Sequence, residues 1–243
     1  EQQQKSRLRF VAEHFQDKRA LDVLFIATSY NFNATQYDLA IKHAQQIIDW
    51  PSSANKTVTQ GELVSSKTLP QADAKMLLES YLIKAHSLYA KQDYLLAEVS
   101  YQEVLKRLSK KDQRRAALIE NLAACVFKQA EILVADNKKA LAADEFLRVG
   151  QVAPRSLLRS SAEYDAANYL YELKLWPKMI KVLADFRKRY PKHALKDTLP
   201  AKLALAYRET KQWELAADEL RLMYALAKTE KEKKETLYIV AEL

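Results

Sequence analysis

The chain has 243 residues, 49% of them hydrophobic, and Lys plus Arg outnumber Asp plus Glu by 39 to 31, a formal net charge of +8. Its two glycines, Gly61 and Gly150, are too few for phosphate-cradling loops or a dinucleotide fingerprint. Few turns are therefore expected to need a positive φ angle, and the composition predicts long helices joined by short loops. No apolar run approaches the ~20 residues of a membrane span. The single cysteine, Cys125, excludes an internal disulfide, and its apolar neighbours predict a buried thiol.

Apolar residues at helical spacing predict a series of helix pairs. Residues 4–17 predict one helix, the second half of a repeat, and residues 21–51 predict the first complete pair. Residues 52–73 are rich in Ser, Thr and Asn and predict a loop insertion, either functional or simply tolerated. Further pairs are expected at 75–109, 112–154, 156–191 and 197–228, and residues 232–243 would begin another repeat. Because a repeat is interrupted at each end, we expect one solenoid, excerpted from a longer chain.

The five helix pairs share one fixed spacing of small and aromatic residues, which we call the frame. The first helix of each pair has a first small position, occupied by Thr28, Ala85, Ala130, Ala167 and Ala204. Twelve residues later the second helix has a second small position, occupied by Ala40, Ala97, Ala142, Met179 and Ala216. Three residues before that stand Tyr37, Tyr94, Lys139, Trp176 and Trp213. Small residues let the two helices of a hairpin approach closely, and the aromatic residue is expected to pack over the turn.

The stretch from Val126 to Pro154 is the most complete repeat, with Ala130, Leu133, Ala142, Phe146 and Pro154 in order. This order resembles the W-x2-L-G-x2-Y, A-x3-F, P pattern of the tetratricopeptide repeat family, although Val126 occupies the Trp position and Gln129 the Leu position. The resemblance covers residues 21–243 apart from 52–73. It implies an all-α, right-handed α-α superhelix of about five helix hairpins with partial terminal repeats.

A second resemblance concerns the cellular compartment. The phrase FRKRYPKHAL at residues 186–195, together with two successive 37-residue spacings between second small positions, is similar to bacterial cell-envelope repeat proteins. Examples are the outer-membrane assembly lipoprotein, whose lipidated N-terminal cysteine is lacking here, and the periplasmic TolA-binding protein. The similarity implies a periplasmic or cell-envelope location, with the cytoplasm as the alternative.

In the tetratricopeptide family the first helices line a concave groove that binds peptides or extended protein segments. Carried over by position, the groove residues of this chain would include His86, Tyr89, Phe127, Glu131, Tyr164, Asn168, Tyr171 and Arg208. The Asn168 amide could both donate to and accept from an extended backbone. The alternative for the tyrosines is packing between neighbouring repeats. The basic clamp for a terminal carboxylate that some relatives carry is not recognisable here.

Two basic clusters are compatible with an acidic partner. One, the basic patch, comprises Lys106, Arg107, Lys110, Lys111, Arg114 and Arg115; the other comprises Lys181, Arg187, Lys188, Arg189 and Lys192. Either could dock acidic protein, phospholipid headgroups or nucleic acid, or serve only as a solubilising surface. Aromatic residues for base stacking are not interleaved with them, which does not favour nucleic acid.

Catalytic and metal-binding patterns are not found in the sequence. The four histidines, His14, His43, His86 and His193, lack metal-ligand spacing and are expected to be solvated helix residues. No nucleophile elbow occurs, so neither an enzyme, a metal nor a cofactor is expected. The sequence favours a non-catalytic scaffold that binds protein or peptide segments within a cell-envelope assembly. The alternatives are a helical accessory domain of a larger cell-wall enzyme and a basic nucleic-acid-binding solenoid.

Overall fold

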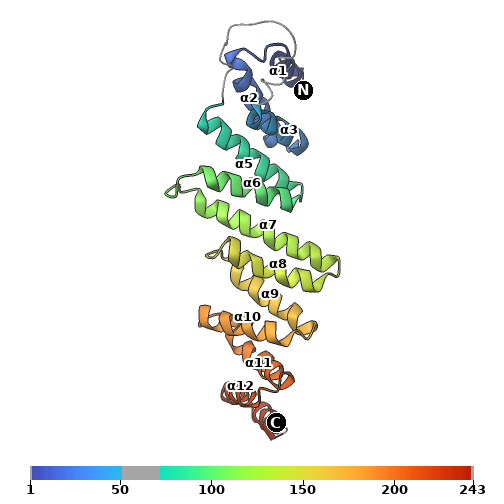
Figure 1. Ribbon diagram of the computed structural model, residues 1–243, viewed down its shortest axis with the longest axis vertical. Coiled ribbons are helices and arrows are strands. Elements are labelled where there is room, and N and C mark those ends of the chain that lie inside the picture. The colour runs from blue at the N-terminus through green and yellow to red at the C-terminus, as the bar shows by residue number, and fades with distance from the viewer. Residues whose placement is uncertain (1, 51–71, 242–243) are drawn as a thin grey trace. The chain divides into compact units, whose positions relative to one another are not determined.

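The computed structural model describes residues 2–50 and 72–241, and these residues contain helices and turns but no strand (Figure 1). The chain divides into two compact units, Glu1–Cys125 and Val126–Leu243, which are described separately below. Of the expected loop at 52–73, only Ala72 and Asp73 lie within the described residues. No described helix combines the length and apolar character that a bilayer crossing requires.

The first unit consists of successive antiparallel helices. They are α1 (Gln2–Glu13), α2 (Lys18–Asn33), α3 (Tyr37–Ile48), α5 (Ala74–Ala90), α6 (Tyr94–Arg107) and the first half of α7 (Arg115–Ala135). Helix α2 packs on α3, α3 on α5, and α5 on α6. Side-chain carboxylates begin three of the helices, since Asp17, Asp73 and Asp93 accept hydrogen bonds from the free backbone N–H groups of the first turns of α2, α5 and α6.

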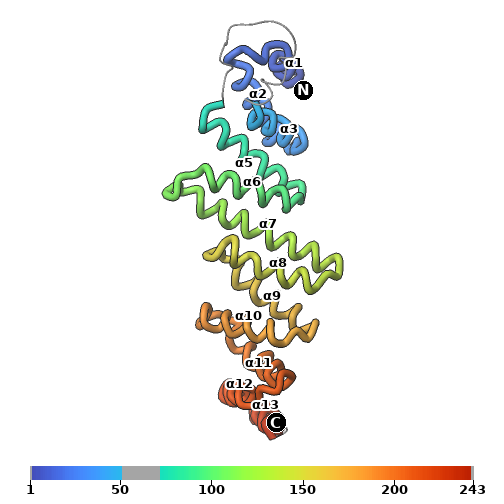
Figure 2. Tube along the Cα trace, in the orientation of Figure 1, coloured from blue at the N-terminus to red at the C-terminus, as the bar shows by residue number. Residues whose placement is uncertain are grey.

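The second unit continues the pattern from the second half of α7. It contains α8 (Lys139–Val152), α9 (Leu158–Glu172), α10 (Trp176–Arg189), a short 3-10 helix η1 (Ala194–Thr198), α11 (Leu199–Glu209), α12 (Trp213–Leu226) and α13 (Glu230–Ala241). From α8 to α13 each helix packs on the next, and the Cα trace shows each one doubling back on its predecessor (Figure 2). The expected all-α class, built from successive helix hairpins, is confirmed; the right-handed superhelical sense stays a prediction.

The small positions are the centre of each hairpin core. All ten residues at the first and second small positions have exposed fractions between 0% and 3%. Thr28 can occupy one of them because its hydroxyl donates to the Leu24 carbonyl of its own helix at 2.7 Å. Met179 is the one large residue in the frame, and it is wholly buried, since its flexible side chain fits an irregular space.

Aromatic residues pack at the hairpin turns, as the frame predicts, in three of the five pairs. The rings of Tyr37, Tyr94 and Trp176 lie 6.2, 5.2 and 5.6 Å, centroid to centroid, from a ring at the end of the preceding helix. Lys139 instead forms an ion pair with Glu172 at 2.7 Å. Trp213 has an exposed fraction of 48%, so in the last pair the aromatic residue covers the turn less completely.

The expectation that few turns need a positive φ angle is wrong. Every hairpin turn contains one non-glycine residue in the left-handed region: Thr35, Gln92, Asn137, Lys174 and Lys211, with φ between 55° and 64°. In each turn the next residue donates its N–H to the carbonyl five positions back, as Gln36 does to Asn31 at 2.8 Å. This is the Schellman closure of a helix, which normally places glycine at the left-handed position. The chain uses residues with a Cβ there and accepts the steric cost.

Replacing Thr35 by glycine is expected to stabilise the protein. Thr35 is β-branched and lies at φ 58°, a conformation that glycine adopts without steric cost. We expect Thr35→Gly to raise the free energy of unfolding by about 1 kcal/mol, measured by urea denaturation. Thr35→Ala keeps a Cβ and should gain less. Equal stability of the two variants would contradict this explanation.

Candidate functional site

The predicted groove residues occupy one face of each first helix. They stand three residues before, one after and four after the first small position, and these spacings of four and three fall on one side of an α-helix. His86 and Tyr89 belong to the first unit, and the remaining six belong to the second.

In the second unit, α9 and α11 form a surface that combines two rings and a cation. The ammonium nitrogen of Lys202 on α11 lies 5.7 Å from the ring centroid of Tyr164 and 4.9 Å from that of Tyr171, both on α9. Both distances permit a cation–π interaction. No carboxylate forms an ion pair with Lys202 among residues 126–241. We call Tyr164, Asn168, Tyr171 and Lys202 the α9 surface.

The two tyrosines of the α9 surface are held differently. The Tyr164 hydroxyl lies 3.0 Å from Thr198 Oγ1, and its ring lies 6.1 Å from the ring of Phe186, so Tyr164 contributes to packing as well as to the surface. The Tyr171 ring contacts Trp176 edge-on and has an exposed fraction of 36%. Tyr171 therefore offers the more accessible ring.

Asn168 lies between the two tyrosines in sequence and is half-buried. Its side-chain amide has no hydrogen-bond partner among the residues that the structure describes. One turn earlier stands Asp165, whose pKa is raised by burial and further by the nearby carboxylate of Glu131. Glu131 itself is exposed and pairs with Lys128 at 2.6 Å. The α9 surface thus presents a free amide beside a half-buried carboxylate and aromatic rings.

Phe127 and Arg208 differ from the other predicted residues of the second unit. The Phe127 ring meets Phe146 edge-on at 5.0 Å, and Phe146 stacks on Tyr169 at 6.0 Å, so Phe127 takes part in the packing of α7, α8 and α9. Arg208 is half-buried, and no hydrogen bond or ion pair joins its guanidinium to another described residue. The structure brings Tyr164, Asn168 and Tyr171 together and does not join Arg208 to them.

In the first unit, His86 is fixed by packing. Its Nδ1 lies 2.7 Å from the hydroxyl of Tyr101, which has an exposed fraction of 1%, and its ring lies 6.3 Å from that of Phe32. Burial lowers the pKa of His86 and raises that of Tyr101. Tyr89 meets Tyr94 edge-on at the hairpin turn. His86 and Tyr89 therefore both contribute to the hairpin of α5 and α6.

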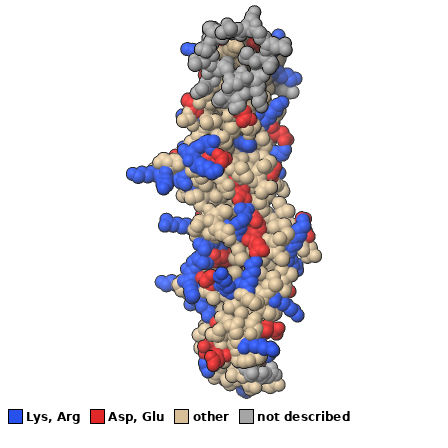
Figure 3. Space-filling view, in the orientation of Figure 1, with Lys and Arg blue, Asp and Glu red and all other residues tan. Residues whose placement is uncertain are grey.

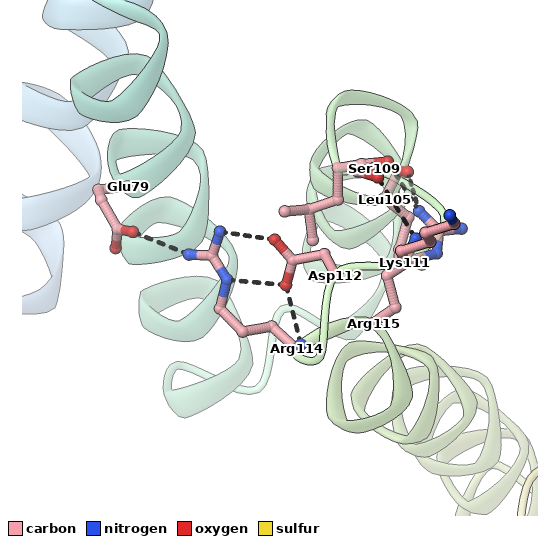
Figure 4. A network of polar contacts seen from close by, with 8 residues as sticks. Glu79, Leu105, Ser109, Lys111, Asp112, Arg114 and Arg115 are labelled. Atoms are coloured by element: carbon pink, nitrogen blue, oxygen red, sulfur yellow. Dashed lines mark hydrogen bonds and ion pairs between the residues drawn. The ribbon is translucent and has the colours of Figure 1, made fainter.

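The basic patch lies at the turn between α6 and α7, and much of its charge is paired there (Figure 4). Arg114 donates to both carboxylate oxygens of Asp112 and reaches Glu79 Oε1 at 3.0 Å. Arg115 donates to the backbone carbonyl of Leu105 at 2.6 Å, near the end of α6. These contacts fasten the turn to α5 and α6.

A second part of the basic patch is organised by Glu103. Its carboxylate accepts hydrogen bonds from Lys106 at 2.7 Å and from Arg107 at 2.5 Å. The Arg107 guanidinium also lies 4.0 Å from the ring centroid of Tyr81 and donates to its hydroxyl. The hydrogen bonds from Lys106 and Arg107 lower the pKa of Glu103 to about 2.

Lys110 and Lys111 are the members of the basic patch whose ammonium groups have no partner among the described residues. Both are exposed. The other four cations of the patch bind carboxylates or carbonyl groups of the protein itself. The patch therefore leaves two ammonium groups open to an external anion, fewer than its composition indicates.

The lowered pKa of Glu103 predicts a pH dependence of stability. A carboxyl whose folded pKa lies below the unfolded value, near 4.3, stabilises the protein above that value and ceases to do so as the pH falls toward 2. We expect Glu103→Gln to lower Tm slightly at pH 7 and to make Tm less dependent on pH between about 4 and 2. Circular dichroism melting at stepped pH measures this, with Glu209→Gln as the control. A parallel pH profile for wild type and Glu103→Gln would contradict the assignment.

The histidines and the cysteine do not form a catalytic arrangement in the described part of the chain, where no group of three or more His, Cys, Asp or Glu side chains could hold a metal ion. The expectation of solvated histidines is wrong for His43, which has an exposed fraction of 4% and lies 3.0 Å from the amide nitrogen of Asn31. His193 accepts the Leu195 N–H at the start of η1. Cys125 is wholly buried, and burial raises the pKa of its thiol to about 12. A thiol so rarely ionised is a poor nucleophile.

Sequence reasoning found the α9 residues but missed Lys202. The frame placed Tyr164, Asn168 and Tyr171 on one helical face because they are separated by four and three positions within a single helix. Lys202 comes from the next hairpin and stands two residues before the first small position Ala204. A comparison of the residues two positions before each first small position would have indicated Lys202.

No family model matches this chain, and no curated protein matches it in sequence. Among solved structures, it is similar to YrrB, a tetratricopeptide protein with an unusual peptide-binding site, at 11% identity and a TM-score of 0.38, over 97% of this chain and 99% of YrrB. The apo form of RapI matches at 12% identity and a TM-score of 0.39, over 96% of this chain and 62% of RapI. A signal transduction ATPase with a tetratricopeptide repeat sensor from Pyrococcus horikoshii matches at 13% identity and a TM-score of 0.41, over 97% of this chain and 35% of that protein. The assignment of the fold rests on the helix packing within this chain and not on these similarities.

Proposed function

We propose that this chain is a non-catalytic interaction module that binds an extended peptide segment on the α9 surface. The observation that carries the proposal is the Asn168 amide, half-buried and without a hydrogen-bond partner among the described residues, on the same helical face as Tyr164 and Tyr171. A half-buried amide that no protein group engages can exchange its water for the donor and acceptor of a ligand. An extended backbone offers the matching donor and acceptor.

The rings and the cation of the α9 surface suit the side chains of such a segment. Tyrosine provides a large contact area and has few rotatable bonds, so its ordering costs little entropy. Tyr164 is already held by Thr198 and Phe186, and Tyr171 by Trp176, so little further ordering is needed on binding. Lys202 lies over both rings and adds a donor for a polar group of the segment.

Nucleic acid is the less favoured partner. In the basic patch, four of six cations are engaged within the protein. Binding to phosphates depends on free cations that displace counterions. Because most cations of the basic patch are paired within the protein, its net positive charge gives little support to nucleic-acid binding.

A cell-envelope location is part of the proposal and is supported by the sequence phrase at residues 186–195. In the structure this phrase joins α10 to η1: Phe186 is wholly buried, and the rings of Tyr190 and His193 pack on it at 4.9 and 5.1 Å. The phrase thus has a structural role that other repeat proteins could share. Fractionation of the native cell with an antibody to this chain checks the compartment, and recovery in the cytosol alone would contradict the proposal.

Asn168→Ala is expected to weaken peptide capture without weakening the fold. Peptides selected from a random phage-displayed library on the full chain serve as probes, and fluorescence anisotropy measures their binding. We expect about tenfold weaker binding, the effect of losing one or two backbone hydrogen bonds. The melting temperature should hardly change, because the amide has no described partner in the protein.

Gln151→Ala is the matched control, since it removes an exposed amide from α8. It should bind the selected peptides as the wild type does. Equal affinity of wild type and Asn168→Ala for every selected peptide would overturn the α9 surface as the binding site. Failure of the library to yield any binder would count against peptide binding itself.

A further inference from the structure

The outward side of α10 carries a row of charged residues. Lys178, Lys181, Asp185 and Lys188 recur at helical spacing and so lie along one side of the helix; we call them the α10 face. The opposite side holds Met179, Leu183 and Phe186, all with exposed fractions of 0%. Lys and Arg side chains gather over the region of α8 to α10 in the space-filling view (Figure 3). The helix thus contributes its apolar residues to the core and its lysines to the surface.

The arginines at the end of α10 are used inside the protein. Arg187 donates to both oxygens of Glu219 at 2.8 and 2.6 Å, and Arg189 to both oxygens of Glu163 at 2.7 and 2.6 Å. Both glutamates have an exposed fraction of 6%. Arg187 uses two nitrogens, the bidentate geometry that arginine favours, whereas Arg189 contacts both oxygens through Nη1 alone. Two buried carboxylates therefore pair with these two guanidinium groups.

The lysines on the same helix are available to an external anion. Lys178 pairs with Asp144 on α8, but Lys181 and Lys188 are exposed and have no ion pair or hydrogen bond among residues 126–241. A rise of about 1.5 Å per residue separates their backbone positions by roughly 10 Å. Two acidic residues a few positions apart in a peptide can span such a distance.

A cleft of about 280 Å³ opens beside these lysines, between α8 and α10. Leu147 of α8 and Val182 of α10 provide apolar lining. The charged lining residues are Lys178, Lys181, Arg189, Glu163 and Asp185. Both apolar residues are half-buried. The cleft has room for an aliphatic side chain. Lys181 is the cation of its lining that forms no ion pair among residues 126–241, so a carboxylate of a ligand can pair with it.

We propose that the α10 face and this cleft bind an acidic protein segment in which an aliphatic residue stands between carboxylates. The carboxylates meet Lys181 and Lys188, and the aliphatic side chain enters the cleft against Leu147 and Val182. This site shares no residue with the α9 surface and is a second interaction surface of the module. It does not depend on peptide binding at Asn168.

A membrane or a nucleic acid fits the α10 face less well than an acidic protein segment does. Met179, Leu183 and Phe186 are wholly buried and Ile180 and Val182 are half-buried, so none of these side chains is exposed for insertion into a bilayer. Asp185 stands between Lys181 and Lys188, so the face carries no continuous row of cations to match successive phosphates. Phe186 is buried and Trp176 packs on Tyr171, so neither ring of α10 is placed for base stacking.

Charge reversal on the intact chain tests the proposal. The probe is a fluorescein-labelled peptide, Glu-Glu-Leu-Glu-Glu-Leu-Glu-Glu, followed by fluorescence anisotropy at physiological salt. The double variant Lys181→Glu and Lys188→Glu should bind about tenfold more weakly than wild type, since two attractive pairs become repulsive. A probe with Gln in place of every Glu should not bind the wild type. The variant should keep the wild-type melting curve.

The control variant is Lys110→Glu with Lys111→Glu in the basic patch, which makes the same change in net charge at two other exposed, unpaired lysines. It should change the affinity less than about twofold, because the proposed site does not include these lysines and an exposed charge outside a binding site contributes little. Equal weakening by both double variants would mean that only net charge matters and would overturn the site. No binding of the acidic probe, or binding of phosphatidylserine vesicles alone with the same dependence on Lys181 and Lys188, would overturn the assignment of an acidic protein partner.

Discussion

The close approach of two helices within each hairpin is the constraint on which the structure depends. Ten positions in one frame must be small or deformable, and the structure buries every one of them almost completely. A larger, stiffer side chain would push the helices beyond the 8–10 Å at which their side chains interlock. The same constraint decides which side chains are left for the surface. When one side of a helix packs inside its hairpin, the residues on its other sides can contact neighbouring hairpins or a ligand.

The turns show how the chain meets that constraint with few glycines. All five hairpins close with the same pair of backbone hydrogen bonds and the same left-handed residue, although the side chains there range from Thr to Lys. A conserved geometry with varied residue types means that tertiary packing determines the turn and overrides local preference. Composition is a poor guide in such a case, which is why the scarcity of glycine suggested the wrong backbone angles.

Local periodicity explains which features could be predicted from sequence. The helices, the small positions and the common face of Tyr164, Asn168 and Tyr171 all repeat within one or two helices, so spacing alone indicates them. Pairing between distant residues leaves no such pattern. The sequence shows Arg187 and Arg189 as part of a basic cluster, and only the structure shows that Glu219 and Glu163, 32 and 26 residues away, take up their charge. Likewise, the burial of His43 depends on Asn31 in the facing helix.

Gly150 has a consequence that extends beyond α8. A Cβ atom at this position would lie 2.7 Å from Arg159 Nε, and that nitrogen donates to Glu163 at 2.8 Å. The carboxylate of Glu163 is also the one that Arg189 binds from α10. The absence of a methyl group in one helix thus allows a charged cluster that ties together the next two. The space that a glycine leaves and the ion pairs of this cluster are therefore coupled, so even alanine, the residue that helices tolerate best, would require the Arg159 side chain to shift.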